Sequence, residues 1–287
     1  MNKLNILLPL YNDWKSFNSL LKKINYELKK TNRYVNILVL NDSSTQRVNI
    51  ICNNLKFIKK IKILTSTKNI GSQKIISMGL EYLKSKKNEI IVVMDSDGED
   101  DVSYLNILID QSIKRKNFVI VAKRIKRKEN FIFQFLYNIH LMITFFLTMK
   151  WISFGNYSCF HSKNLGKILK NNLSWLAYSS CIMKNCNIYK VNAERQKRIF
   201  GKSKLTFFGL FKHSFRVLAV FQIKIILISI LYIFLISFVE FNFPIEIKYS
   251  FVSILIIINF FIFISKKNTL EDYSRKKILL KRVENIK

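Results

Sequence analysis

Between Leu4 and Ala122, short runs of β-branched apolar residues alternate with longer segments of helical period. Uninterrupted apolar strands separated by helices are typical of a parallel sheet that is covered on both faces. The ligands of such sheets bind beyond the carboxyl ends of the strands. The pattern therefore predicts an α/β domain with a mostly parallel sheet. The expected strands are Leu4–Leu10, Asn36–Leu40, Ile61–Thr65, Glu89–Met94 and Phe118–Ala122, and the expected helices are Ser16–Lys30, Thr45–Leu55, Ser72–Ser85 and Ser103–Lys116.

Two long apolar segments follow in the last third of the chain. Val217–Val239 contains one charged residue, Lys224, and as a helix it would be about 34 Å long, enough to cross a hydrocarbon core of about 30 Å. Tyr249–Ser265 carries no charge and is near the lower length limit for a span. Lys and Arg flank the pair, whereas the connecting loop EFNFPIEIK is more acidic. The positive-inside rule then predicts a hairpin of two transmembrane helices with both flanks in the cytoplasm.

A third apolar segment, 131–150, is interrupted by polar residues and follows the basic run KRIKRK. At about 100° per residue, the polar positions fall within an arc of roughly 160°. We therefore expect an amphipathic helix that lies in the membrane interface. A buried core helix and a third span are the alternatives. The polar positions are Gln134, Asn138, His140, Thr144 and Thr148.

The composition is strongly basic. Among 287 residues, 48 Lys and Arg face 18 Asp and Glu, which gives a formal net charge of +30. A field of this sign favours polyanionic surroundings such as a phosphate-rich membrane or nucleic acid. A basic surface that is simply solvated explains the charge equally well. The cysteines have no CxxC spacing and no neighbouring pair of histidines, so we expect reduced thiols and no zinc site. The N-terminal apolar run is too short for a signal peptide.

Carboxylates crowd the end of the apolar run EIIVVM. Clustered like charges repel unless a cation or hydrogen-bond donors neutralise them, and carboxylate oxygens suit Mg²⁺ or Mn²⁺. Such an ion is commonly held by one or two carboxylates together with substrate phosphates, and it can act as a Lewis acid on a leaving diphosphate. The alternative is an acidic turn without a metal. For Asp101 we prefer this alternative and expect the residue to cap the next helix. The residues are Asp95, Asp97, Glu99, Asp100 and Asp101.

Six short motifs occur in a fixed order along about the first 215 residues. They are LPLYND, LNDSS, KNIGSQKIISMGL, MDSDGED, VAKR and RIFGKSK. In this order the chain resembles the family 2 glycosyltransferases of the GT-A fold, and among them the branch akin to dolichyl- and polyprenyl-phosphate sugar synthases. The resemblance implies a GT-A domain, with a Rossmann-like and mostly parallel sheet, followed here by a C-terminal helical membrane hairpin.

The resemblance also implies a function for each residue that matches a motif. Asp97 and Glu99 would ligate a divalent metal, Mg or Mn. Phosphates of the donor or of a phosphorylated acceptor would be bound by Arg198, Ser203 and Lys204, together with Arg124. Contacts with the donor are implied for Pro9, Tyr11, Asp13, Asp42, Asp95 and Arg124, with Asp42 at the base or ribose.

Some residues depart from the family pattern. Asn41 precedes Asp42 where a second acid is usual, which affects the details of nucleotide contact. Glu99 stands where many polyprenyl-phosphate synthases have Gln, and an anionic ligand there should still bind metal. Asp101 and Val102 replace the usual prolines after Asp100.

The implied reaction is an inverting, single-displacement transfer from a nucleoside diphosphate-sugar. Asp95 and Asp97 belong to its catalytic centre. A lipid phosphate acceptor is already anionic and needs no general base, whereas a hydroxyl acceptor needs a carboxylate, for which Asp100 is the candidate. We expect a lipid-linked acceptor, with polyprenyl phosphate first. The alternatives are a transferase that elongates a lipid-linked surface glycan and, in another class, a non-catalytic basic membrane protein that binds phospholipid or nucleic acid.

The chain is thus expected to have three parts. Residues 1–215 would form the glycosyltransferase domain, 216–266 the two transmembrane helices, and 267–287 a basic cytoplasmic tail. We expect a multi-pass protein of a bacterial-type inner membrane, with the catalytic domain and the C-terminus in the cytoplasm. Its expected partners are the sugar nucleotide, the lipid-linked acceptor and the membrane, without nucleic acid. A homo-oligomer is compatible with this organisation.

Overall fold

The structure is a computed structural model that describes residues 3–125, 131–201, 207–238, 244–275 and 279–287. The strands are β1 (Lys3–Leu10), β2 (Val35–Asn41), β3 (Ile58–Ser66), β4 (Glu89–Val93), β5 (Phe118–Arg124), β6 (Phe154–His161), β7 (Asn187–Ala193) and β8 (Leu280–Asn285). The helices are α1 (Trp14–Lys30), α2 (Ser72–Tyr82), α3 (Leu105–Lys114), α4 (Phe131–Thr148), α5 (Leu165–Ile168), α6 (Tyr178–Asn185), α7 (Phe207–Ala219), α8 (Gln222–Phe238) and α9 (Ile245–Ser274).

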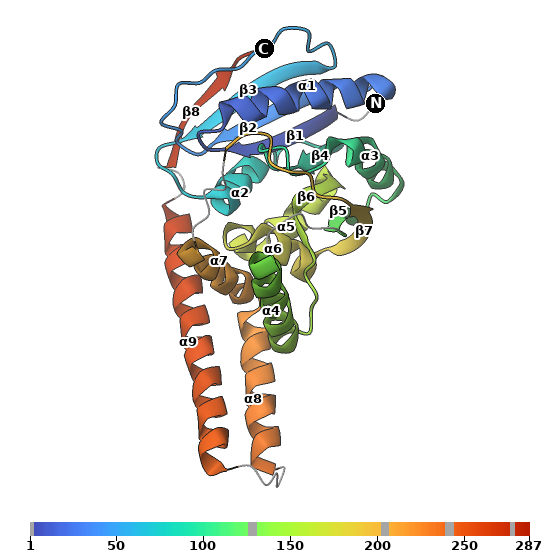
Figure 1. The fold of residues 1–287 in the computed structure, drawn as a ribbon. Coiled ribbons are helices and arrows are strands. Elements are labelled where there is room, and N and C mark those ends of the chain that lie inside the picture. Colours follow the sequence, from blue (N-terminus) through green and yellow to red (C-terminus); the bar gives the residue numbers. More distant parts are fainter. Residues whose placement is uncertain (1–2, 126–130, 202–206, 239–243, 276–278) are drawn as a thin grey trace.

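In the described part of the chain, eight strands form one sheet in the order β7-β5-β6-β4-β1-β2-β3-β8 (Figure 1). β1 pairs in parallel with both β2 and β4, and the pairs β2–β3 and β5–β7 are also parallel. β6 and β8 are antiparallel to their neighbours. The mostly parallel sheet that the sequence predicts is confirmed. Because β2 and β4 lie on opposite sides of β1, the loops after β1 and β4 flank the reversal of strand order, where such sheets bind ligands.

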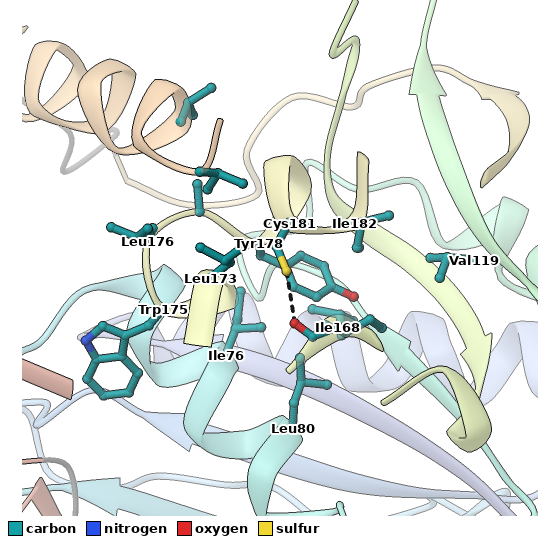
Figure 2. Close-up of a cluster of buried hydrophobic side chains, with 14 of the residues drawn as sticks. Ile76, Leu80, Val119, Ile168, Leu173, Trp175, Leu176, Tyr178, Cys181 and Ile182 are labelled. Atoms are coloured by element: carbon teal, nitrogen blue, oxygen red, sulfur yellow. Dashed lines mark hydrogen bonds between the residues drawn. The ribbon is translucent and has the colours of Figure 1, made fainter. Parts of the chain in front are cut away.

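Both faces of the sheet are buried, as its apolar strands require. On one face, α1 and α3 cover a cluster that includes Phe17, Leu20 and Ile24. On the other face, α2 packs against α6 and the short helical turns before it. Figure 2 shows this second cluster, in which Tyr178 and Cys181 of α6 lie among apolar side chains and the Cys181 thiol donates a hydrogen bond of 2.9 Å to the Ile168 carbonyl.

The five strands expected in the first 122 residues are present, and so are three of the four helices, with shifted ends. The expected helix Thr45–Leu55 is wrong, because this segment runs as a loop. Asparagine side chains of α1 satisfy its backbone instead. The Asn18 side chain donates to the Asn49 carbonyl at 2.9 Å and accepts from the Ile51 amide at 3.0 Å, and Asn25 makes the same pair of contacts further along. A loop whose backbone groups are paired in this way needs no helix.

The first expected span, Val217–Val239, is corrected at its N-terminal end. Helix α7 ends at Ala219, α8 begins at Gln222, and the two helices are bent by 85°. At the break, Val220 and Phe221 are buried against the α/β domain. The Val220 carbonyl, which the break removes from the helical ladder, accepts a hydrogen bond of 2.6 Å from Lys184. The globular domain thus holds the point at which α8 begins.

The second expected span lies inside α9, which has 30 residues and continues beyond Ser265. Within the described residues, α9 is the single helix that is long and apolar enough to cross a membrane, and the bent pair α7–α8 adds a second only if it is counted as one span. Helices α8 and α9 project together from the domain (Figure 1). Asn259 of α9 donates a hydrogen bond of 2.9 Å to Ser229 of α8.

The segment 267–287, expected as a basic cytoplasmic tail, contains regular structure that packs on the domain. Helix α9 extends to Ser274, and the chain then forms β8, which pairs antiparallel with β3. Asp272 forms an ion pair with Lys74 of α2, and the Tyr273 hydroxyl donates to Glu81 at 2.8 Å. The edge of a sheet has unpaired backbone groups that need a cover, and β8 supplies it for β3. The glycosyltransferase domain expected over 1–215 therefore takes a strand from beyond the apolar helices.

Gly79 tests how closely α2 packs on the sheet. A Cβ atom there would lie 2.6 Å from a methyl carbon of Leu40, so we expect Gly79→Ala to destabilise the protein by about 1–3 kcal/mol. Gly166→Ala in α5 is the matched control, because a Cβ there meets no atom within 4 Å and the change should stabilise by about 0.4–1 kcal/mol. Denaturant unfolding measures both. Equal stability of the two variants would contradict the packing.

Candidate active site

The acidic loop after β4 is built on a backbone turn at Gly98. Its φ of 81° lies in the left-handed region, and a Cβ atom would come within 2.4 Å of the Ile199 side chain. The segment 195–199 lies against this loop, since the Gln196 amide donates to the Glu99 carbonyl at 2.9 Å and the Ile199 amide donates to the Asp97 carbonyl at 3.1 Å. The late basic segment and the acidic loop therefore form one structural unit.

Each carboxylate of the loop has a distinct set of partners. Asp97 accepts from the Glu99 amide at 3.0 Å, and Glu99 forms an ion pair with Arg195. Asp100 is buried, with 5% of its surface exposed, and accepts from the Asp95 amide at 2.9 Å. Asp101 accepts from the Ser103 amide at 2.9 Å and caps the short helical turn that leads into α3. The cap expected at Asp101 is confirmed.

Arg198 links this loop to the loop after β1. Its guanidinium forms an ion pair with Asp13 and donates to Asp97 at 3.3 Å. A second link joins the same loops, because the Ser96 hydroxyl donates to the Pro9 carbonyl at 2.7 Å. Tyr11 lies between Pro9 and Asp13 and is half-buried. Four of the predicted residues, Pro9, Asp13, Asp97 and Arg198, thus meet at the reversal of strand order.

Crowding and burial change the acidity of the loop. Burial, and then the negative charges of Asp95 and Glu99, raise the pKa of Asp97 to about 7. Burial and the charge of Asp95 raise the pKa of Asp100 to about 7, although Arg124 opposes the shift. The site therefore holds more negative charge than its own donors stabilise.

Asp42 has a different environment from the one expected. It is 3% exposed, and its two oxygens accept from the amides of Ile70 and Gly71 at 2.8 and 2.7 Å. Burial raises the pKa of Asp42 against these hydrogen bonds. The carboxylate thus holds the Asn-x-Gly loop in place, and its contact with a base or ribose stays a prediction.

The sequence reasoning missed several partners of the site. Asn156 of β6 donates to Asp95 at 2.9 Å and accepts from Gln73 of α2 at 3.1 Å, so Asp95 is positioned through two other elements. Arg195, the partner of Glu99, belongs to the basic stretch before RIFGKSK and could have been suspected there. Asn156 had no such signal, because β6 was not predicted. Ser203 and Lys204 lie outside the described residues.

Arg124 stands at the end of β5 beside the site. A Cβ atom at Gly155 of the neighbouring β6 would lie 2.5 Å from its guanidinium, so the guanidinium occupies the space that a side chain at this position would need. Its charge acts on the buried Asp100. Arg124 at the end of β5 thus acts on Asp100 in the loop after β4.

The carboxylates of Asp97 and Glu99 fit a hard divalent cation. They are adjacent on one turn, they offer only oxygen, and Asp97 is disfavoured as an anion by its neighbours. In the described residues, no group of three or more His, Cys, Asp or Glu could hold a metal by itself. An ion here would therefore need further oxygens from water or substrate phosphates, which is the usual manner of Mg²⁺. Arg195 and Arg198 occupy the same carboxylates and would compete with it.

Comparison with known proteins identifies the family. The pattern of glycosyl transferase family 2 matches residues 5–168, which is more than half of the chain and includes the whole acidic loop. The chain belongs to glycosyl transferase family 2. It is therefore a glycosyltransferase, as the order of its motifs predicts. No curated protein sequence matches this glycosyltransferase.

Solved structures with the same fold include two sugar-phosphoglycerate synthases. Glucosyl-3-phosphoglycerate synthase from Mycobacterium tuberculosis, in complex with Mn²⁺, UDP-glucose and phosphoglyceric acid, is 14% identical, with 78% of this chain and 80% of that chain covered and a TM-score of 0.53. Mannosyl-3-phosphoglycerate synthase from Rubrobacter xylanophilus is 12% identical, with 86% and 80% covered and a TM-score of 0.53. At such low identity the likeness concerns the fold, which is GT-A as expected.

The raised pKa values predict a pH dependence of stability. Asp97 and Asp100 keep their protons up to about pH 7 when folded but only to about pH 4 when unfolded, so stability of the metal-free protein should fall as the pH rises through this window. Asp97→Asn should reduce the fall. Asp101→Asn is the control, since hydrogen bonds from Ser103 and Gln196 outweigh burial and lower the pKa of Asp101. Melting temperatures at several pH values measure the effect, and a rise with pH in the wild type would contradict it.

Proposed function

We propose that this glycosyltransferase is bound to a membrane and transfers a sugar from a nucleoside diphosphate-sugar to a lipid-linked acceptor, with polyprenyl phosphate as the first candidate. The observation that carries the proposal is the pair of apolar helices that leaves the catalytic domain (Figure 1). Large apolar side chains on α8 and α9 are exposed, among them Ile223, Leu227, Ile256 and Phe260. Exposed apolar surface of this extent marks a membrane or a protein contact.

The path of the chain supports two crossings. β8 follows α9 and pairs with β3, so the chain returns to the domain from which α8 departs. If α9 crosses a bilayer, α8 has to cross it as well to bring β8 back to the same side. With basic flanks on both helices, we place the catalytic domain and the C-terminus in the cytoplasm of a bacterial-type cell.

Helix α4 supports contact of the domain with lipid. Its polar residues Thr144 and Thr148 are buried against the protein, whereas Phe135, Met142 and Phe146 are exposed. One apolar face of α4 is therefore turned away from the domain, whereas Leu141 and Leu147 of the same helix are buried. The Tyr232 hydroxyl of α8 donates to the Phe146 carbonyl at 2.8 Å and ties α4 to the apolar pair. We infer that α4 lies in the membrane interface against α8.

Asp97 and Glu99 would hold a divalent metal, Mg or Mn. A metal bound there would neutralise charge that develops on the leaving diphosphate. Arg195 and Arg198 sit within reach of the same oxygens and are placed to bind the diphosphate through their planar donor groups once it enters. Asn156 holds Asp95 through a hydrogen bond, and in this proposal Asp95 contacts the donor. The complex of the Mycobacterium tuberculosis enzyme with Mn²⁺ and UDP-glucose supports this reading by analogy of fold.

Asp100 is the residue whose role depends on the acceptor. A phosphate acceptor attacks as an anion, so Asp100 then serves only to hold the Asp95 backbone. A hydroxyl acceptor would need a base, and a carboxyl with a pKa of about 7 is suited to take its proton at neutral pH. Deep burial argues for the structural role. This supports the lipid phosphate over a glycan hydroxyl.

Asp97→Ala tests the active site. We expect transfer to fall by about a hundredfold or more, because the variant loses a metal ligand and the partner of Arg198. Asp101→Ala is the control in the same loop. It removes a helix cap, at a cost of about 1 kcal/mol, and should keep most of the activity. Transfer from a labelled sugar nucleotide is measured in membranes, and normal turnover by Asp97→Ala would refute the metal assignment.

The acceptor is tested by incubating membranes that contain the protein with a panel of labelled sugar nucleotides, with and without polyprenyl phosphate. We expect a product that is extracted by organic solvent, requires added polyprenyl phosphate, and disappears with EDTA. Label that enters only a larger lipid-linked glycan would instead indicate elongation of a surface polysaccharide precursor. The absence of a metal-dependent product with every donor would overturn the proposal.

A further inference from the structure

A polar hollow of about 410 Å³ lies at the carboxyl ends of β2 and β3, at the same edge of the sheet as the acidic loop. One wall is the loop after β2, which contributes Arg47. The opposite wall is β8, which contributes Lys281, Arg282 and Glu284. Thr65 lies between the walls. Pockets for small ligands commonly measure about 300–1,000 Å³, so the hollow is large enough for part of a nucleotide.

The strand register builds the inner side of the hollow. Asn41 of β2 is opposite Thr65 of β3, and Thr65 is opposite Arg282 of β8. Side chains that are opposite one another in neighbouring strands share a face of the sheet. The Asn41 side chain also accepts from the Ser44 amide at 3.0 Å, which fixes the start of the outer loop.

Asn12 connects the hollow with the active site. Its amide donates to the Ser44 hydroxyl at 2.9 Å, and its side chain donates to Thr45 at 2.9 Å and accepts from the Gln46 amide at 3.0 Å. The next residue is Asp13, which binds Arg198. The outer wall of the hollow is therefore fixed to the loop that carries the donor residues after β1.

The hollow has an excess of positive charge. Arg282 forms an ion pair with Glu284, at 3.2 Å between Nε and Oε1. Arg47 and Lys281 line the same space, and neither has a carboxylate partner among the residues that the structure describes. Both side chains carry only hydrogen-bond donors, so they suit a ligand with acceptor oxygens or nitrogens.

We propose that β8 is part of the donor site and that Arg47, Lys281 and Arg282 bind the base of the donor nucleotide. This inference rests on the proposed function, since the diphosphate would lie at the acidic loop and the nucleoside would extend past Asn12 into the hollow. Cationic donors favour a base whose edge presents acceptors, such as O6 and N7 of guanine or O4 of uracil. The amino groups of adenine and cytosine are poor partners for them.

The test measures, by titration calorimetry, the binding of UDP, GDP, CDP and ADP to the full-length protein in detergent. Each nucleotide is titrated in the presence of Mn²⁺. We expect UDP or GDP to bind most tightly. The double variant Arg47→Ala, Lys281→Ala should weaken that nucleotide about tenfold and reduce the preference over CDP and ADP. Arg47→Lys keeps the charge but loses the planar fork, and should recover only part of the affinity. Lys60→Ala, an exposed lysine of β3 that does not line the hollow, is the control and should bind as the wild type does.

Each outcome bears on a different statement. If the double variant keeps the melting temperature, the nucleotide affinity and the base preference of the wild type, the role of β8 in the donor site is overturned. Sugar transfer by the wild type would still leave the proposed function intact. If the wild type binds CDP or ADP most tightly, the role of β8 in the donor site is also overturned. A wild type that binds none of the four nucleotides, and transfers no sugar, would refute the proposed function as well.

Discussion

Arg198 is the contact on which the geometry of the active site depends. It reaches Asp13 after β1 and Asp97 after β4, and so joins the two loops at the reversal of strand order. Carboxylates this close would repel one another without a positive charge between them, and burial increases the penalty. A cation at Asp97 would compete with this arginine for the carboxylate, so binding of a metal-bound donor would be coupled to release of Arg198.

The parts of the fold that follow from local chemistry could be predicted from the sequence. The apolar residues of β1 to β4 are buried on both faces of the sheet, as are those of β5 after Phe118, and their composition alone indicates this. The acidic loop and the cap at Asp101 could also be predicted from local composition, because few other arrangements accommodate so many acids. Thr45–Leu55 shows the limit. Its residues Val48, Ile50 and Cys52 pack on the core at a spacing of two residues, which is not a helical spacing, and distant asparagines satisfy its backbone.

What could not be predicted depends on contacts between distant residues. Val220 and Phe221 are apolar, and nothing local tells whether such residues face lipid or the domain against which they pack. They pack against the domain, and this contact breaks the helix between α7 and α8. In the same way, LKRVEN has too few apolar residues to resemble a buried strand, and it forms β8 only because β3 offers an open edge. The pairing of Asn156 with Asp95 required β6 to be placed first.

The position of β8 in the chain has a consequence for biosynthesis. Ribosomes make β3 early, and its edge stays unpaired while the central strands and all the apolar helices are still being made. An open strand edge is a site of aggregation. Because β8 emerges only after α9, the sheet closes only after all of these helices have been made. Chains that stop before β8 would therefore keep the edge of β3 open to pairing with other chains.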